Sequence, residues 1–518
     1  MPVRTELPTR VVYVGTNDGQ DPPRLHSSNG EIAGYVALSY CWGGPQRHQT
    51  ERNRIERYAH ALPMEELPKS LQDAILLTRV LGIQYIWIDS LCIIQDCDED
   101  KDREMARMAN IYKNSIFTIS AGRAKSCDEG FLGVQDKRVS LLQMSIKLPM
   151  NCLNGAVGSV LLYPSRKQSR SDDRPIDKRA WTYQEKLLSR RMVNFLDDAI
   201  EWNGPNCEMS DDQLGNYELG ATDPTYLNLT KLFGSLSNGI RILYLVLEYG
   251  HLAPEGLEDL PIYWWTAVYE YTHGSLSNLD DKLPAIAGVA SEFHNLNGDV
   301  YIAGLWMSHL TKGLQWRCGK SLEESSNNIG SKELKYDAPT WTWASVNECV
   351  IYGPSKEYDL DSDRVEIIDC KVNLVSPSAP FGPVNGGELR LRAPLKFLSY
   401  SQIQEMLALV DSGGEFIGRI FVDRRSRCHA DELTTLCGGA APHIESTGVW
   451  FLGLSKHADL NYESSGLALA KRADGLFERL GKFQIDEDHS QFRVRTAEQD
   501  QLRASWGDDY VVTDVTIV

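Results

Sequence analysis

Two carboxylates stand out in the stretch that begins at Tyr85, YIWIDSLCIIQDCDEDKDREM, and they are the candidate catalytic residues. Asp89 interrupts an apolar run that predicts a buried strand. A carboxylate there needs partners, so we expect Asp89 to be buried and to accept at least two hydrogen bonds. Glu104 falls in the predicted first turn of the next helix. It could hold a cation or act as acid or base, or only interact with the helix dipole. From position alone, a structural role is the simpler explanation of each.

Candidate binding residues follow the strand predicted at 35–42, YVALSYCW. Trp42 could stack on a ring or fill the core. Gly43 and Gly44 would let the backbone approach a phosphate, although the segment is neither a P-loop nor a dinucleotide fingerprint. A later helix in RAWTYQEKLLSRRMVNF has a mixed polar and aromatic face that suits a site or an interdomain contact. Its candidate residues are Arg179, Trp181, Gln184 and Glu185.

The elements that must position these residues alternate between strand and helix. After the first strand, residues 67–82 show helical apolar spacing, with Pro68 at the start and Gly82 as the stop. The strand from Tyr85, another helix and the segment IFTISAG then follow. This order predicts a parallel sheet with right-handed crossovers, whose strands share one carboxyl edge. Open sheets bind ligands at that edge, where Trp42 and Glu104 are expected.

The length of 518 residues favours about three domains. We predict an α/β domain over 1–215 and a mainly helical region over 216–345. That region includes DKLPAIAGVASEF and YIAGLWMSHLTKGLQW as helices. Alternating apolar and polar segments and the turn signal Asp474-Gly475 predict an antiparallel β domain over 346–518.

Composition limits the partners. Asp and Glu number 71 against 53 Lys and Arg, and a net charge of −18 disfavours nucleic acid. The eleven cysteines include no C-x-x-C pair, so no metal site is expected. No signal peptide and no apolar run of membrane-spanning length is recognisable, which predicts reduced thiols and a cytoplasmic protein without a membrane span. No histidine lies between His60 and His251 to serve as a base near Asp89.

Three blocks together resemble the fungal heterokaryon-incompatibility (HET) domain family: YVALSYCWGG, the stretch from LPKSLQDAILL to NSIFTISA, and RAWTYQEKLLSRRMVNF. The resemblance is dense over about 35–205. The segments DKLPAIAGVA, YIAGLW, APTWTWASV and GLALAKRADGLFERLGKF resemble the region that often follows this domain. The family is tied to fungal non-self recognition and regulated cell death. The resemblance also implies a fold of the Toll/interleukin-1 receptor (TIR) or flavodoxin type.

Several TIR domains cleave the nicotinamide–ribose bond of NAD with a glutamate on a helix that follows a parallel strand. Glu104 occupies the matching place, where it could stabilise an oxocarbenium-like transition state. Trp42 would stack on a base or on nicotinamide. The resemblance therefore implies NAD as a substrate and no required cofactor. Lys101 stands where the family usually has tryptophan, and it could pair with Glu104 or meet a phosphate.

Two other functions remain open. A stand-alone HET-fold enzyme of the cyclase, isomerase or lyase type would act on a small molecule in fungal secondary metabolism. A non-catalytic module would signal by assembling into a homo-oligomer. For an enzyme, we expect Arg179, Gln184 or Glu185 to reach the same cleft as Trp42 and Glu104.

Overall fold

The structure is a computed structural model that forms two compact units, Met1–His251 and Leu252–Val518. The predicted boundary at 215 lies outside the described residues, and the division into three parts stays a prediction. The structure describes residues 4–16, 18, 20–133, 146–151, 157–162, 174–197, 199–204, 208–210, 260–319, 338–352, 365–399, 418–422, 448–456, 462–486 and 511–518.

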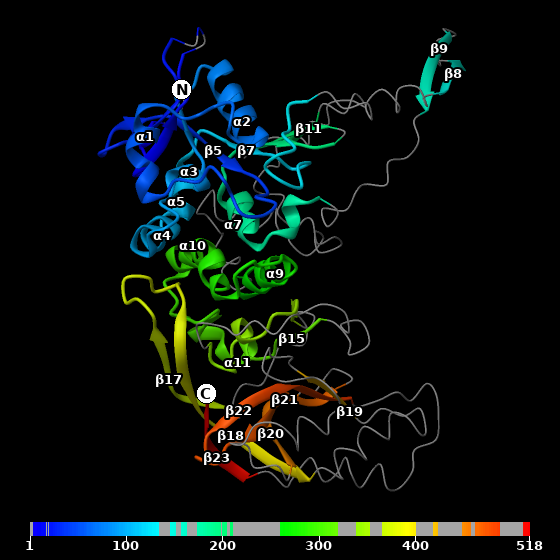
Figure 1. The fold of residues 1–518 in the computed structure, drawn as a ribbon. Coiled ribbons are helices and arrows are strands. Elements are labelled where there is room, and N and C mark those ends of the chain that lie inside the picture. Colours follow the sequence, from blue (N-terminus) through cyan, green and yellow to red (C-terminus); the bar gives the residue numbers. More distant parts are fainter. Residues whose placement is uncertain are drawn as a thin grey trace. The chain divides into compact units, whose positions relative to one another are not determined.

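The N-terminal unit is a mixed α/β domain, as predicted (Figure 1). Its eight-stranded sheet has the order β12-β11-β10-β7-β5-β6-β2-β3, and the four central strands β10, β7, β5 and β6 run parallel. The outer pairings on both sides are antiparallel. The strands are β2 (Arg10–Tyr13), β3 (Arg24–Ser27), β5 (Tyr35–Ser39), β6 (Tyr85–Trp87), β7 (Thr118–Ser120), β10 (Met192–Phe195), β11 (Ile200–Asn203) and β12 (Glu208–Ser210).

Helices of this unit pack apolar faces onto a core centred on β5 and β6. The predicted helix at 67–82 is confirmed as α2, which follows Pro68 and is succeeded by Gly82 at a φ of 74°. Its residues Leu71, Ala74 and Ile75 are buried in that core. The remaining elements are α1 (Ile55–His60), α2 (Lys69–Val80), α3 (Asp89–Cys92), α4 (Asp98–Met105), α5 (Met108–Asn114), α7 (Ala180–Leu188), the 3-10 turns η1 (Arg52–Arg54) and η3 (Ile176–Lys178), and the two-stranded pairs β1 (Thr5–Glu6) with β4 (Ile32–Ala33) and β8 (Ile146–Asn151) with β9 (Val157–Leu162).

Two local predictions in the Tyr85 stretch are wrong. The strand ends at Trp87, and Asp89 opens the short helix α3, because the Asp89 carboxylate binds the next backbone N–H and its own carbonyl accepts from Ile93. The apolar run therefore continues as a buried helical turn. Glu104 lies in the last turn of α4, not the first, since that helix already starts at Asp98.

The described part of the C-terminal unit first contains helices, one small hairpin (β13 with β14) and the two-stranded pair of β15 with β16, around buried tryptophans. The predicted helix from Tyr301 is wrong over its first six residues, which form a hairpin because Ala303 and Gly304 both adopt positive φ. The elements are α9 (Leu260–Thr272), η7 (Leu279–Asp281), η8 (Pro284–Ile286), α10 (Ala287–Asn297), β13 (Tyr301–Ile302), β14 (Leu305–Trp306), η9 (Met307–His309), α11 (Leu310–Gly313), β15 (Arg317–Cys318), η10 (Trp343–Ser345) and β16 (Val350–Ile351).

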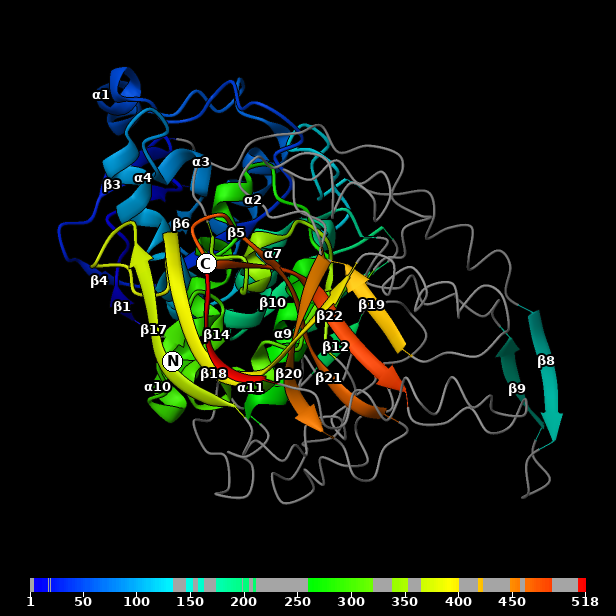
Figure 2. The same cartoon turned by 90° about the horizontal axis from the view of Figure 1, so that it is seen from below.

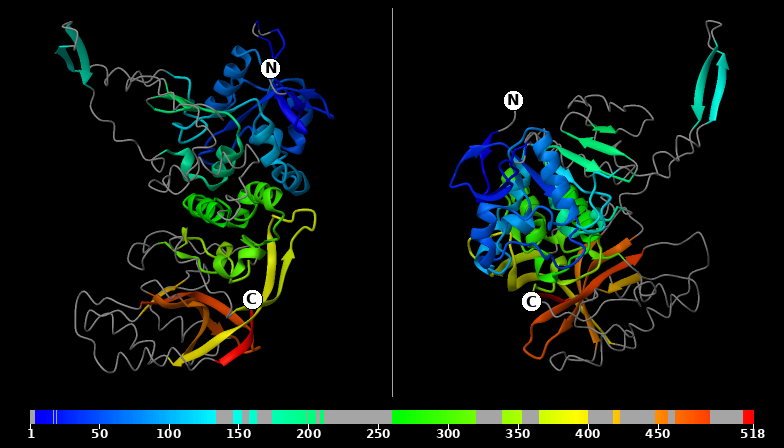
Figure 3. Two further views of the ribbon diagram at one scale, coloured as in Figure 1. Left: turned by 180° about the vertical axis from the view of Figure 1, so that it is seen from behind. Right: turned by 45° about the horizontal axis from the view of Figure 1, so that its top comes forward.

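The predicted C-terminal β domain is confirmed as a small barrel. The sheet has the order β17-β18-β20-β21-β22-β19, and β23 closes a ring by pairing with both β18 and β22. All its described pairings are antiparallel except β22 with β23 (Figures 2 and 3). Asp474-Gly475 lies in the predicted turn between β21 and β22. The strands are β17 (Glu366–Leu374), β18 (Val384–Ser399), β19 (Gly418–Val422), β20 (Gly448–Lys456), β21 (Tyr462–Lys471), β22 (Phe477–Asp486) and β23 (Val511–Ile517).

Across the part of the chain that the structure describes, no helix has both the length and the apolar character to cross a bilayer.

Candidate functional site

Asp89 lies just beyond the carboxyl end of β6, where the chain turns into α3. Its Oδ2 accepts a hydrogen bond of 2.8 Å from Trp42 Nε1, and its Oδ1 accepts one of 2.6 Å from the backbone N–H of Ser90. The prediction of two hydrogen bonds is confirmed, but the residue is half-buried, not fully buried. Trp42 is also half-buried and packs on the core. The indole therefore holds the carboxylate at the surface of the sheet edge.

Arg179 brings a positive charge to this edge from the start of α7. Its guanidinium donates to the carbonyl of Tyr40, the residue after β5. Burial raises the pKa of Asp89, while the Arg179 charge and the Trp42 hydrogen bond lower it in part. Arg179 also acts electrostatically on Glu185, one turn and a half along the helix. The Arg179 guanidinium therefore interacts electrostatically with both Asp89 and Glu185.

Glu185 is the most perturbed carboxyl group near this arginine. Its side chain is only 4% exposed, and burial raises its pKa from 4.5 to about 7. The Arg179 charge and the hydroxyls of Ser39 and Tyr112 partly oppose this rise, and the Asp89 charge adds to it. Glu185 Oε2 has no hydrogen-bond partner among the described residues. A carboxyl group in this state exchanges a proton near neutral pH, which suits acid–base chemistry.

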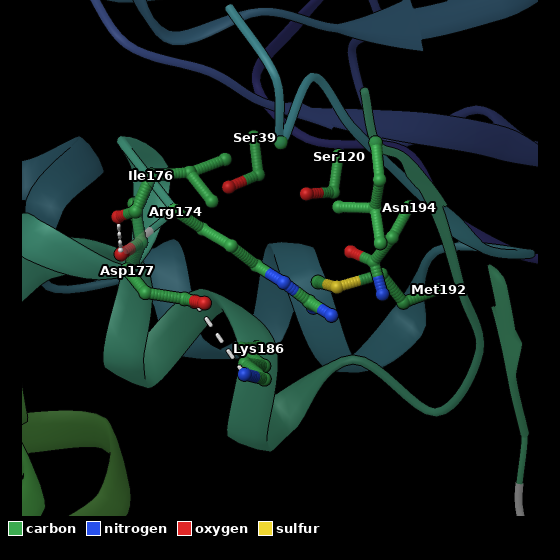
Figure 4. Close-up of a pocket in the computed structure, with 11 residues that line it drawn as sticks. Ser39, Ser120, Arg174, Ile176, Asp177, Lys186, Met192 and Asn194 are labelled. Carbon is green, nitrogen blue, oxygen red and sulfur yellow. Dashed lines mark hydrogen bonds and ion pairs between the residues drawn. The ribbon is translucent and has the colours of Figure 1, made fainter. Parts of the chain in front are cut away.

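A small polar hollow adjoins these groups at the carboxyl ends of β5, β7 and β10 (Figure 4). Its empty volume is about 290 Å³, part of it open solvent. Ser39 borders the hollow and is also close to Glu185. The lining residues are Ser39, Ser120, Gly122, Arg174, Ile176, Asp177, Thr182, Lys186, Met192, Asn194 and Leu196.

Several polar atoms in the hollow lack a partner. Asn194 is 5% exposed, and its Nδ2 has no hydrogen-bond partner among the described residues; Arg174 Nε is in the same condition. The charges are only partly balanced within the site: Lys186 Nζ is 3.4 Å from Asp177, and the Arg174 guanidinium is 3.2 Å from Glu201. Buried donors without acceptors suit a ligand that carries hydroxyl, carbonyl or phosphate oxygens.

Glu104 lies in a different environment. It is 0% exposed, with Oε1 3.4 Å from Arg103 Nε and 3.9 Å from Arg10 Nη2. Arg10 also pairs with Asp100. Among the described residues, no hydrogen bond or ion pair joins Glu104 to Trp42 or Arg179. A cleft shared by Trp42 and Glu104 with Arg179, Gln184 or Glu185 stays a prediction. Direct contact of Glu104 with a substrate would require this ion cluster to open.

The other predicted binding residues take separate positions. Lys101 Nζ lies 4.0 Å from Asp98 Oδ1, and this ion pair differs from the expected pairing with Glu104. Trp181 is half-buried against the core and Gln184 is buried. Gly43 has a φ of 74°, and a Cβ there would lie 2.2 Å from the Ser126 Cβ, so this glycine permits close packing of two loops.

Sequence reasoning missed the hollow. Ser39 and Ser120 end the observed strands β5 and β7 but lie inside the longer predicted strands 35–42 and IFTISAG, so the predicted strand ends did not mark them. Arg174 and Asn194 carried no recognisable signal. No group of three or more metal-ligating side chains occurs in the described ranges.

Residues 35–185 match the family model for heterokaryon incompatibility protein (HET). The chain carries a HET domain. Its match begins with the first residue of β5 and ends at Glu185 in α7, so Trp42, Asp89 and Arg179 all belong to the HET domain. This links the chain to heterokaryon incompatibility. No curated protein and no solved structure matches the chain.

Proposed function

We propose that the HET domain cleaves the N-glycosidic bond of a nucleotide of the NAD type. One observation carries the proposal: two carboxyl groups with unequal surroundings share Arg179 at the carboxyl edge of the sheet. Asp89 accepts two N–H hydrogen bonds, whereas Glu185 is buried with a pKa of about 7. Glycoside cleavage commonly uses two carboxyl groups that their environments keep in different protonation states.

The two groups would have distinct tasks. The C1′–N bond breaks, and its electron pair leaves with the nicotinamide nitrogen, so positive charge develops on the ribose. The Asp89 carboxylate, fixed by Trp42 and Ser90, would stabilise that charge. A water molecule then adds to C1′ and passes its proton to the Glu185 carboxylate, which is about half ionised near pH 7. The products are nicotinamide and ADP-ribose.

The hollow also offers polar groups to part of a nucleotide substrate. They are the unpartnered Asn194 amide beside Ser39, and the Arg174 and Lys186 cations, which are paired with Glu201 and Asp177. Ribose hydroxyls and phosphate oxygens can accept from such donors. Consumption of NAD would also give a HET domain a direct route to the cell death with which the family is associated.

Incubation of the purified chain with NAD tests the proposal, with chromatography of released nicotinamide as the measurement. We expect release by the parent and a loss of roughly a hundredfold to a thousandfold in Asp89→Asn and Glu185→Gln. Glu56→Gln is the matched control, because Glu56 is an exposed glutamate on α1. Absence of nicotinamide release by the parent, or full activity in both variants, would refute the proposal.

A further inference from the structure

A cysteine and a histidine form a close pair in the C-terminal unit. Cys349 Sγ lies 3.4 Å from His273 Nδ1 and 3.5 Å from Nε2. His273 directly follows α9, and Cys349 directly precedes β16. His273 is exposed and Cys349 is half-buried, so both can meet a dissolved reagent. The pair is separate from the HET domain and independent of the nucleotide chemistry proposed above.

The surroundings favour a protonated imidazole. His273 Nδ1 is 2.7 Å from the Tyr269 carbonyl, which can accept a proton donated from that nitrogen. Nε2 is then the nitrogen that exchanges a proton with Cys349. The ring also sits at the carboxyl end of a 13-residue helix, where the helix dipole stabilises a cation.

Electrostatics agree with this geometry. The hydrogen bond with Cys349 is the main cause that raises the pKa of His273 to about 9; burial lowers it, and the Tyr269 carbonyl raises it. Glu270 adds a favourable negative charge to the imidazolium. Among the described residues, Lys282 interacts electrostatically with Cys349 and with Glu348. At neutral pH the imidazolium therefore faces the sulfur of Cys349.

We propose that Cys349 is a nucleophilic thiol site that forms mixed disulfides with low-molecular-weight disulfides. The Cys349 thiolate attacks one sulfur of the reagent, so that a new S–S bond forms and the old one breaks. The second half of the reagent leaves as a thiolate with the electron pair and takes a proton from water. Cys349 is thereby oxidised and the leaving half is reduced. His273 keeps its proton and loses its anionic partner.

Other cysteines in the described part of the chain lack this environment. Cys97 Sγ is 3.0 Å from Arg52 Nη2 and donates a hydrogen bond of 3.2 Å to the Glu99 carboxylate, so its partners do not include a histidine. Burial raises the pKa of the remaining thiols for which a change is resolved, namely Cys41, Cys92, Cys127 and Cys370. Cys318 is 7% exposed on the strand that pairs with β16.

Glutathione disulfide is the probe for the test. The full chain is exposed to it across a pH series, and mass spectrometry of peptides measures the rate of mixed-disulfide formation at Cys349. An ordinary thiol slows by roughly tenfold for each pH unit below about 8.5. We expect the parent rate to fall by less than about threefold between about pH 8 and about pH 6.

His273→Gln removes the cation and should restore the ordinary slope. Its rate at about pH 6 should fall at least about tenfold below the parent, with little difference at about pH 9. Cys318→Ser is the control and should leave the Cys349 profile unchanged. If the rate of mixed-disulfide formation at Cys349 in the parent falls with pH as steeply as that of an ordinary thiol, the proposal is overturned without any variant. A His273→Gln profile that coincides with the parent also overturns it.

Discussion

Glu185→Gln gives a prediction with a magnitude set by the structure. Burial places the pKa of Glu185 at about 7 in the folded chain, against 4.5 when the group is in water. Since each pH unit corresponds to about 1.36 kcal/mol, ionised Glu185 destabilises the folded HET domain by about 3 kcal/mol. The folded state binds a proton at Glu185 more tightly than the unfolded state does. The contribution of this proton to the free energy of unfolding is therefore fully present below pH 4.5 and is lost as the pH rises through about 7.

Glutamine mimics the protonated acid and cannot ionise. The difference in free energy of unfolding between the variant and the parent should therefore grow by about 3 kcal/mol, in favour of the variant, from about pH 4.5 to about pH 8. Subtracting the free energy of unfolding of the parent from that of the variant at each pH removes the contributions of all other titrating groups, because both proteins contain them. Hydrogen exchange of peptides that cover β5 and α7 measures the HET domain separately from the rest of the chain.

The same variant should release nicotinamide roughly a hundredfold to a thousandfold more slowly. A Glu185→Gln variant that is more stable than the parent at about pH 8 but less active would show that Glu185 is kept for function at a cost in stability. The reasoning is refuted if parent and variant differ by the same free energy at both pH values, because Glu185 would then not be a buried acid with a raised pKa.

Three further outcomes are expected. Asp89→Asn should lose activity by about a hundredfold or more, and melting experiments should show a loss of about 1–2 kcal/mol because the amide NH₂ faces one of two N–H donors. Glu104→Gln should destabilise the domain by about 2–3 kcal/mol yet keep nicotinamide release per folded molecule; unchanged melting would contradict the buried ion cluster. Gly43→Ala should lower stability at least about 1 kcal/mol more than Gly82→Ala in denaturant titration. Both glycines have a φ of 74°, and only the first would meet Ser126; equal losses would exclude this clash as the cause.

Much of the fold follows from short-range patterns in the sequence, which explains why it could be predicted. The apolar spacing of α2 and the flanking Pro68 and Gly82 define one helix without any knowledge of its partners. The alternation of strands and helices through β5, β6 and β7 similarly limits the topology to a parallel sheet. Short elements were less predictable: the apolar run after Trp87 suits a strand or a buried helical turn equally well, and only its hydrogen bonds decide between them.

The sequence by itself determined that Trp42 follows a strand of the parallel sheet at its carboxyl edge. Which carboxyl groups work together depended on the tertiary structure. Arg179 acts on Asp89 only after the crossovers bring α7 back to β5. Burial in the folded domain raises the pKa of Glu185, and the Ser39 and Tyr112 hydroxyls partly oppose that rise. The resemblance to TIR domains favours Glu104 as the catalytic residue, but a resemblance in sequence does not report how deeply a side chain is buried. Its complete burial beside Arg10 is a consequence of packing between segments that are distant in the chain.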